Sequence, residues 1–227
     1  MKTLVLATGN PGKIKECETF LGPAGFTVLG LDALSDPTPV EETGGTFEAN
    51  ARLKAEGYSL RTPHLVLADD SGLEVDALGG GPGVLSARYG GPDLNDPERC
   101  AAILAALAQT PDDKRTARFR CVLALAQAGR TLATYDGVVK GSILREPRGA
   151  NGFGYDPIFF HAPSGRAFAE LTREEKARVS HRGQALRKIG DSPLFLTNLL
   201  GYRFDKKKGT VPYFRDRKST RLNSSHG

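Results

Sequence analysis

The spacing of hydrophobic residues in the first part of the chain alternates between that of buried strands and that of amphipathic helices. Nearly continuous apolar runs at residues 2–8 and 26–31 predict two buried strands. Apolar residues that recur every three or four positions at about 13–21 and 46–58 predict two helices. The chain therefore opens with strands and helices in alternation, which is typical of an α/β fold.

A hairpin interrupts this alternation in the second half of the chain. Strand-like residues 118–126 and 131–141 flank a short turn that contains glycine. Because hairpin strands pair antiparallel, we expect a mixed central sheet flanked by helices rather than a purely parallel sheet. The other expected elements are a strand at 65–68 that stops at Asp69, a helix opened by Asp96-Pro97-Glu98, a Gly-rich loop at 149–160 that leads into a strand, a capping box at 172–175, a helix after Ser180-His181-Arg182 and a last helix at 192–200.

Charge divides the chain into a body and a tail. The 227 residues carry a net charge of +5, but residues 201–227 hold eight Lys and Arg against two Asp, a net charge of +6. Residues 1–200 are left with −1, so the body has no bulk basic surface for nucleic acid. We expect one domain over 1–200 and a basic tail over 201–227 that is disordered or foreign to the folded protein.

No segment predicts export or membrane insertion. No apolar run approaches the ~20 residues of a spanning helix, and the apolar start is too short for a signal peptide. The three cysteines, Cys17, Cys100 and Cys121, cannot all pair, and their spacing is not that of a zinc site. We expect a cytoplasmic protein with reduced, buried cysteines.

The segment Thr8-Gly9-Asn10-Pro11-Gly12-Lys13 connects the first strand to the first helix. Its glycines allow a ligand to approach the backbone, and the unpaired N–H groups of a helix start attract phosphate together with Lys13. The segment is not a Walker A loop. A phosphate-binding loop and an ordinary strand–turn–helix connection both fit it.

Two pairs of consecutive carboxylates, Glu41-Glu42 and Asp69-Asp70, are candidates for a metal site. Asp69-Asp70 follows an apolar strand, where α/β sheets bind their ligands. Since neighbours in a strand point to opposite faces, only one carboxylate of a pair can face a common site. One from each pair would suit Mg²⁺, which takes few protein oxygens together with phosphate oxygens and water. Solvated surface charge is the alternative.

Several further residues are ambiguous when each is taken alone. Lys54 and Lys176 are either surface charges or phosphate contacts. Phe153 and Tyr155, which alternate with glycines, either stack on a base or belong to the core. His181-Arg182 offers donors at a helix start, although a single histidine is usually structural.

The order of these motifs carries more information than any one of them. The chain presents, in sequence, Thr8-Gly9-Asn10-Pro11-Gly12-Lys13, Glu41-Glu42-Thr43-Gly44, Phe47-Glu48-Ala49-Asn50-Ala51 with Lys54-Ala55, Ala68-Asp69-Asp70-Ser71-Gly72-Leu73, Pro82-Gly83 with Ser86-Ala87-Arg88-Tyr89, Gly152-Phe153-Gly154-Tyr155-Asp156-Pro157-Ile158-Phe159, Glu170-Leu171-Thr172 with Lys176, and Ser180-His181-Arg182-Gly183-Gln184-Ala185. Over about residues 1–200 it closely resembles the ITPase-type nucleoside-triphosphate pyrophosphatases. The tail departs from that family, whose chains normally end near Leu200.

The resemblance implies a fold, a reaction and a set of site residues. It implies two lobes with a substrate cleft between them, a homodimer, and Mg²⁺-dependent hydrolysis of ITP, dITP and XTP to the monophosphate and pyrophosphate. By the same likeness Asp70 is the proton acceptor and a metal ligand, with Glu41 as the other metal-site carboxylate and Glu42 as its alternative. The implied substrate contacts are Thr8, Gly9, Asn10, Pro11, Gly12 and Lys13 around the triphosphate, and Phe153, Gly154, Tyr155, Asp156, His181 and Arg182 around the base. Lys54 and Lys176 are implied phosphate or substrate contacts, and Ser71 is an implied substrate contact.

Base selectivity follows from donors and acceptors. If His181 and Arg182 direct donors at the purine 6-position, a carbonyl there is satisfied and the amino group of adenine is not. A non-catalytic purine-nucleotide-binding protein on the same scaffold would keep Phe153 and Arg182 but would not need Asp70. A nucleic-acid-binding function is supported only by the tail.

Overall fold

The computed structural model describes residues 2–192, and its central element is a seven-stranded sheet in the order β2-β1-β3-β4-β5-β6-β7. β1 runs parallel to both of its neighbours, and every other pair of strands is antiparallel. The expected mixed α/β sheet is therefore confirmed. The strands are β1 (Lys2–Ala7), β2 (Phe26–Leu29), β3 (Leu65–Val75), β4 (Thr116–Gln127), β5 (Arg130–Ile143), β6 (Phe159–His161) and β7 (Arg166–Ala167).

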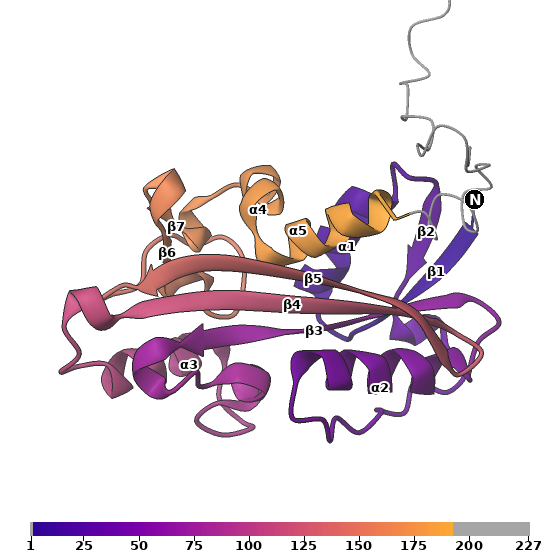
Figure 1. Cartoon of the computed structure of the whole chain (residues 1–227), viewed down its shortest axis with the longest axis horizontal. Helices are drawn as coiled ribbons and strands as arrows, with labels where there is room; N and C mark the ends of the chain where they lie inside the picture. Colours follow the sequence, from indigo (N-terminus) through magenta and orange to yellow (C-terminus); the bar gives the residue numbers. More distant parts are fainter. Residues whose placement is uncertain (1, 193–227) are drawn as a thin grey trace, which may run out of the picture. The chain divides into compact units, whose positions relative to one another are not determined.

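Helices cover both sides of the long strands. In Figure 1, α2 lies on one side of β3, β4 and β5, and α1 and α5 lie on the other. The helices are α1 (Pro11–Leu21), α2 (Phe47–Ser59), α3 (Asp96–Ala106), α4 (Arg173–Val179) and α5 (His181–Gly190). Among residues 2–192, none of them has the length and apolar character needed to cross a membrane.

The expectation that a strand stops at Asp69 is wrong, because β3 continues to Val75. β4 pairs with it without interruption from Val66 to Val75, so the backbone of the polar segment keeps its hydrogen-bond partners. β1, in contrast, pairs only as far as Ala68. The two aspartates therefore lie within a strand, beside the carboxyl end of its parallel neighbour.

The polar segment of β3 also lies between two hydrophobic cores. Val66 and Ala68 belong to a core that includes Phe47 and Ala51 of α2. Leu73 and Val75 belong to a second core, built largely from α3, β4, Phe159 and Phe168. The four residues between them, 69–72, are held in place by packing at both ends, which suits a site that needs fixed geometry.

Most local expectations agree with the structure. The hairpin is confirmed, and its turn has positive φ at Ala128 (50°) and Gly129 (76°). The capping box of α4 is confirmed at Thr172 and Glu175. The expected helix opened by Asp96-Pro97-Glu98 is α3, and its N-cap is the preceding residue Asn95, which forms a capping box with Glu98.

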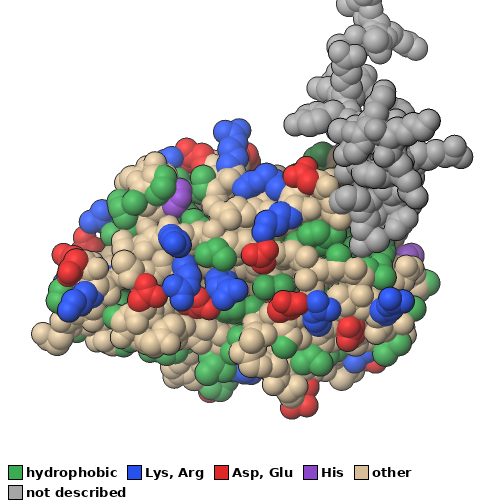
Figure 2. All heavy atoms as spheres, in the orientation of Figure 1, with side chains coloured by type: hydrophobic (Ala, Val, Ile, Leu, Met, Phe, Trp, Pro, Cys, Tyr) green, Lys and Arg blue, Asp and Glu red, His purple; other side chains and the backbone are tan. Residues whose placement is uncertain are grey.

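Some expectations concern parts of the chain that the structure does not describe. The last helix at 192–200, apart from its first residue, and the tail at 201–227 lie outside the described residues. On the face shown in Figure 2, Lys and Arg side chains are interspersed with Asp and Glu. The three cysteines are buried and unpaired, as expected.

Candidate functional site

The two aspartates of β3 point to opposite sides of the sheet, as the alternation of a strand requires. Asp69 contacts Lys13 of α1 and Arg182 of α5. Asp70 contacts Lys54 of α2. The two carboxylates therefore lie in separate environments, with two cations beside Asp69 and one lysine beside Asp70.

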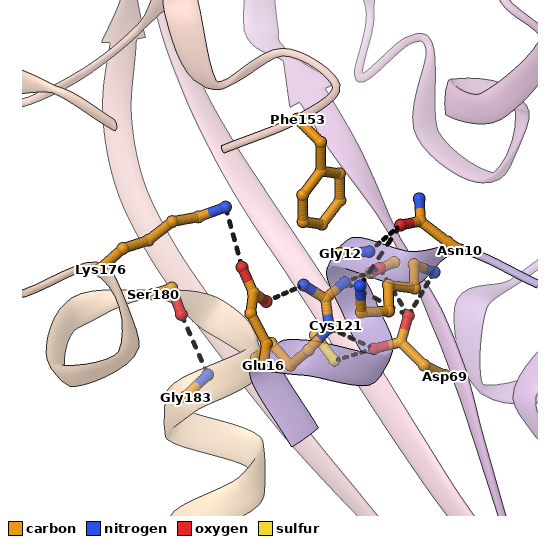
Figure 3. Close-up of polar contacts among 12 residues, drawn as sticks. Asn10, Gly12, Glu16, Asp69, Cys121, Phe153, Lys176, Ser180 and Gly183 are labelled. Atoms are coloured by element: carbon orange, nitrogen blue, oxygen red, sulfur yellow. Dashed lines mark hydrogen bonds and ion pairs between the residues drawn. The ribbon is translucent and has the colours of Figure 1, made fainter. Parts of the chain in front are cut away.

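Asp69 is the centre of a buried polar cluster on the α1 and α5 side (Figure 3). Its carboxylate accepts hydrogen bonds from Lys13 Nζ at 2.5 Å, Arg182 Nε at 2.7 Å, Ser71 Oγ at 2.7 Å and Cys121 Sγ at 3.3 Å. Burial alone would raise the pKa of Asp69, but the charges of Arg182 and Lys13 hold it well below its usual range. Asp69 is therefore a fixed anion whose bonds orient the cations around it.

Glu16 of α1 joins this cluster to the opposite wall of the site. It accepts from Arg182 Nη1, and its other oxygen lies 3.0 Å from Lys176 Nζ of α4. Lys176 also donates to Asp156 Oδ2 at 2.5 Å. Figure 3 shows this line of charged groups running from Lys176 through Glu16 toward Asp69.

Phe153 packs against this line of charges. Lys176 Nζ lies 4.5 Å and Arg182 Cζ 5.6 Å from the ring centroid, which are cation–π distances. A Cβ on Gly12 would come within 2.6 Å of the Phe153 ring. Gly12 is therefore needed for the close approach of an aromatic ring, rather than only for the approach of a ligand.

A cavity of about 270 Å³ opens beside these groups. It runs along the edge of β3 at Ser71 and Gly72, beyond Ala68, which is the last residue of β3 that pairs with β1. Its lining also includes Asn10, Lys13, Asp96, Arg99, Phe119, Phe153, Tyr155, Asp156, Lys176, His181 and Arg182. Its size and mixture of aromatic and charged walls suit a small, anionic, planar ligand.

Asp70 has a different environment, on the α2 side. Lys54 Nζ lies 3.2 Å from Asp70 Oδ1 and 3.0 Å from Glu42 Oε2, and it also donates to the carbonyl of Asp69. Burial raises the pKa of Asp70 to about 6, against the lowering effect of Lys54 and with a further rise from Glu42. Its Oδ2 atom is buried and has no hydrogen-bond partner among the described residues. This oxygen is free to receive a proton or a cation.

The loop that carries Glu41 and Glu42 is fixed by α2. Asn50 Oδ1 accepts a hydrogen bond from Gly44 N at 2.7 Å. Asn50 and Lys54 are both buried, so the alternative of an ordinary surface charge for Lys54 is wrong. Glu42 is the member of the pair that reaches Lys54, and within residues 2–192 Glu41 has no such contact. The assignment of Glu41 to a metal stays a prediction.

The segment from Thr8 to Lys13 folds as a capped helix start. Asn10 Oδ1 accepts from Gly12 N at 2.8 Å and Lys13 N at 3.3 Å, and Thr8 Oγ accepts from Asn10 N. The expectation of unpaired helix N–H groups is therefore wrong for these two amides, because the Asn10 side chain binds them. A phosphate would have to replace Asn10 or bind beside it. Gly9 has open space around it.

Besides Arg182, three of the expected base-pocket residues are deeply buried. The ring of His181 stacks on Phe119 at 4.8 Å, and burial together with nearby cations holds its pKa well below its usual range, so the imidazole is neutral. The Tyr155 hydroxyl donates to Ser86 O at 2.7 Å, and burial raises the pKa of this phenol. Burial also raises the pKa of Asp156, although Lys176 opposes the shift.

Arg182 differs from the expectation in how its donors are arranged. Its Nε, Nη1 and Nη2 atoms already donate to Asp69, Glu16 and Ser71. For Arg182 to donate to a purine 6-carbonyl, one of these bonds would have to break. The geometry therefore favours an orienting role for Arg182, and His181 Nδ1, which is buried without a partner, is the freer group.

Within residues 2–192, no group of three or more His, Cys, Asp and Glu side chains forms a metal cluster. A smaller site fits Mg²⁺, since Asp70 Oδ2 is an unpartnered carboxylate oxygen and Glu42 lies across Lys54 from it. Mg²⁺ commonly takes one or two protein carboxylates and completes its shell with phosphate oxygens and water. The residues present therefore suit the ion together with a phosphate ligand.

The sequence motifs did not identify Glu16, Asp96 or Arg99 as site residues. Glu16 has a weak local signal, because it follows Lys13 by three positions and precedes the buried Cys17. Asp96 Oδ2 accepts from Gly154 N at 2.7 Å, which ties α3 to the aromatic loop. That contact joins residues 58 positions apart, and no local spacing could reveal it.

Glu16→Gln tests the charged line by its pH dependence. Burial raises the pKa of Glu16, but the lowering effect of Arg182 and Lys176 is larger, so the pKa lies below its usual 4.5. The lowered pKa stabilises the fold above about pH 4.5, and this contribution is lost as the pH falls through the folded-state pKa. We expect Glu16→Gln to lower the free energy of unfolding at pH 7 by about 1.5–3 kcal/mol.

Urea unfolding between pH 7 and pH 3 measures this effect. The wild type should lose stability on acidification more steeply than Glu16→Gln. The control is Glu18→Gln, an exposed position on the same helix, which should follow the wild type. Parallel pH profiles for all three proteins would contradict an ionised Glu16.

Comparison with known proteins shows which family the chain resembles. A relative from Bacillus subtilis (strain 168), named dITP/XTP pyrophosphatase, is 47% identical over 189 residues, which cover 83% of this chain and 96% of the relative. A relative of the same name from Exiguobacterium sibiricum is 48% identical over 198 residues, covering 87% of this chain and 98% of the relative. The solved structure of a HAM1 protein from Coxiella burnetii has a TM-score of 0.76 and 42% identity, covering 88% of this chain and 99% of that chain. Residues 4–192 match the Ham1 family, and the chain belongs to that family.

Proposed function

We propose that this protein hydrolyses the deaminated purine nucleoside triphosphates dITP, XTP and ITP to the monophosphate and pyrophosphate, and so removes them from the nucleotide pool. The relatives named dITP/XTP pyrophosphatase support the substrate class. The observation that carries the proposal is the unpartnered Asp70 Oδ2, buried beside Lys54 near the edge of β3 along which the cation-lined cavity runs.

In this proposal the aromatic and phosphate groups of the substrate occupy different parts of the cavity. The base lies along Phe153 and near His181, in the cleft between two lobes. The triphosphate extends toward Lys13 at the start of α1 and toward the edge of β3. Lys13 and Lys54 offset its charge, and their salt bridges to Asp69 and Asp70 hold both ammonium groups in place.

Hydrolysis requires a water molecule aligned with the α-phosphorus. Its oxygen forms a bond to that phosphorus, the bond to the α–β bridging oxygen breaks, and pyrophosphate leaves with the electron pair. Asp70 Oδ2 accepts the proton of the water, and a pKa of about 6 keeps this carboxylate ionised yet basic near neutral pH. Mg²⁺, held by Glu42 or Glu41, would neutralise charge on the phosphate oxygens while Asp70 Oδ2 takes the proton. Binding of Mg²⁺ by Asp70 would be the alternative use of the same oxygen.

The test uses the full chain with ITP, dITP, XTP, GTP and ATP, in the presence of Mg²⁺ or of a chelator. We expect inosine and xanthosine monophosphates with one pyrophosphate per turnover, little product from ATP, and loss of activity with the chelator. Release of inorganic phosphate and a nucleoside diphosphate, or equal rates on all five nucleotides, would contradict the proposal. We also propose that the protein is cytoplasmic and a homodimer, and sedimentation of the same sample tests the dimer.

A further inference from the structure

Three buried side-chain atoms lack a hydrogen-bond partner in residues 2–192, and the residues of two of them, His181 and Arg99, line the cavity, whereas Asp70 lies on the α2 side of the sheet. The three atoms are Asp70 Oδ2, His181 Nδ1 and Arg99 Nε. Buried polar atoms are nearly always bonded, so an exception beside a cavity points to a group supplied by a ligand. Asp70 and His181 already have proposed roles, whereas neither the sequence motifs nor the resemblance assigns one to Arg99.

Arg99 is a cavity-lining cation with an unused donor. The other cations in the lining, Lys13, Lys176 and Arg182, each have a carboxylate oxygen at 2.5–2.7 Å. Arg99 Nη1 lies 3.4 Å from Asp96, which is a weak contact. Only 13% of its side chain is exposed, so bulk water does not readily replace the missing acceptor.

The position of Arg99 places it at the aromatic part of the cavity. It lies on α3, one turn after Asp96, and Asp96 binds the amide of Gly154. Gly154 directly follows Phe153, whose ring we assign to the base. The phosphate-binding segment enters the same cavity through Asn10 and Lys13, which belong to a different element.

We propose that Arg99 binds the purine base through a carbonyl oxygen and adds to the preference for oxopurines. This inference rests on the proposed function. The Nε–H group only donates, and a ring carbonyl only accepts, so hypoxanthine and xanthine satisfy it. Adenine presents an amino group in place of the 6-carbonyl and leaves the donor unpaired.

The decisive variant is Arg99→Met, which keeps the apolar stem and removes every donor. A hydrogen bond to a charged group corresponds to about a 10- to 100-fold change in affinity. We expect kcat/KM to fall by about that factor for ITP, dITP and XTP, mainly through KM, with little change for ATP. Arg130→Met, at the exposed first residue of β5, is the control and should behave as the wild type.

Three results would overturn the assignment. An equal fall for all four nucleotides would make Arg99 a general electrostatic or structural residue. Unchanged kinetics would remove it from the site. A fall for ITP without a fall for dITP would assign the contact to the ribose hydroxyl. If Arg99→Met does not fold, Arg99→Lys keeps the charge without the Nε–H group. It should also lower kcat/KM for ITP, dITP and XTP.

Product binding separates this inference from the proposed function. Calorimetry with IMP, XMP and AMP measures the contact without turnover. If the wild type hydrolyses none of the triphosphates, the proposed function fails. Weaker binding of IMP and XMP, but not AMP, by Arg99→Met would still support the base contact, and unchanged IMP affinity would overturn it.

Discussion

Asp70→Asn should lower turnover of ITP by at least about 100-fold while the protein stays folded. The substitution keeps the shape of the side chain and removes the basic oxygen that we assign to proton transfer. Burial raises the pKa of Asp70 to about 6, so the folded state disfavours the ionised carboxylate. Removing that charge should therefore leave the unfolding temperature unchanged or raise it.

Steady-state rates of pyrophosphate release and a thermal melt on the same preparation test this expectation. Asp113→Asn, an exposed aspartate in the turn before β4, is the matched control and should keep full activity. Near-normal turnover in folded Asp70→Asn would show that Asp70 is neither the base nor an essential metal ligand.

Arg182→Met should cause the largest loss of stability among the site variants. Arg182 is 1% exposed and its guanidinium binds both Asp69 and Glu16. Removing it leaves two buried carboxylates without their main partner, and breaking a buried ion pair in this way costs about 3–5 kcal/mol. For a chain of this size, that corresponds to a fall in Tm of about 6–20 °C.

Urea and thermal unfolding measure this loss. The control is Arg187→Met, an exposed arginine on the same helix α5, where surface substitutions usually change stability by less than about 0.5 kcal/mol. A wild-type Tm for Arg182→Met would show that the cluster does not depend on this side chain. Arg182 could then act as the base-selecting donor, as the motif first indicated.

The order of the motifs was enough to identify the family. The apolar runs predicted β1, β2 and the hairpin of β4 and β5, because those strands are buried and each keeps a single hydrophobic pattern along its length. The polar residues 69–72 concealed the second half of β3. Its continuation depends on pairing with β4, whose residues lie about 50 positions away in sequence.

The sequence by itself determined the fold class, the strand–helix order and the chemical types present at the site. Only the tertiary structure decided which charges are partners. Asp69 and Arg182 are 113 residues apart, and Glu16 and Arg182 are 166 apart, so their contacts depend on how α1, β3 and α5 pack. The tertiary structure also separated Asp69 from its neighbour Asp70. Burial with two cations makes the first a permanent anion, and burial with a single shared lysine leaves the second able to take a proton.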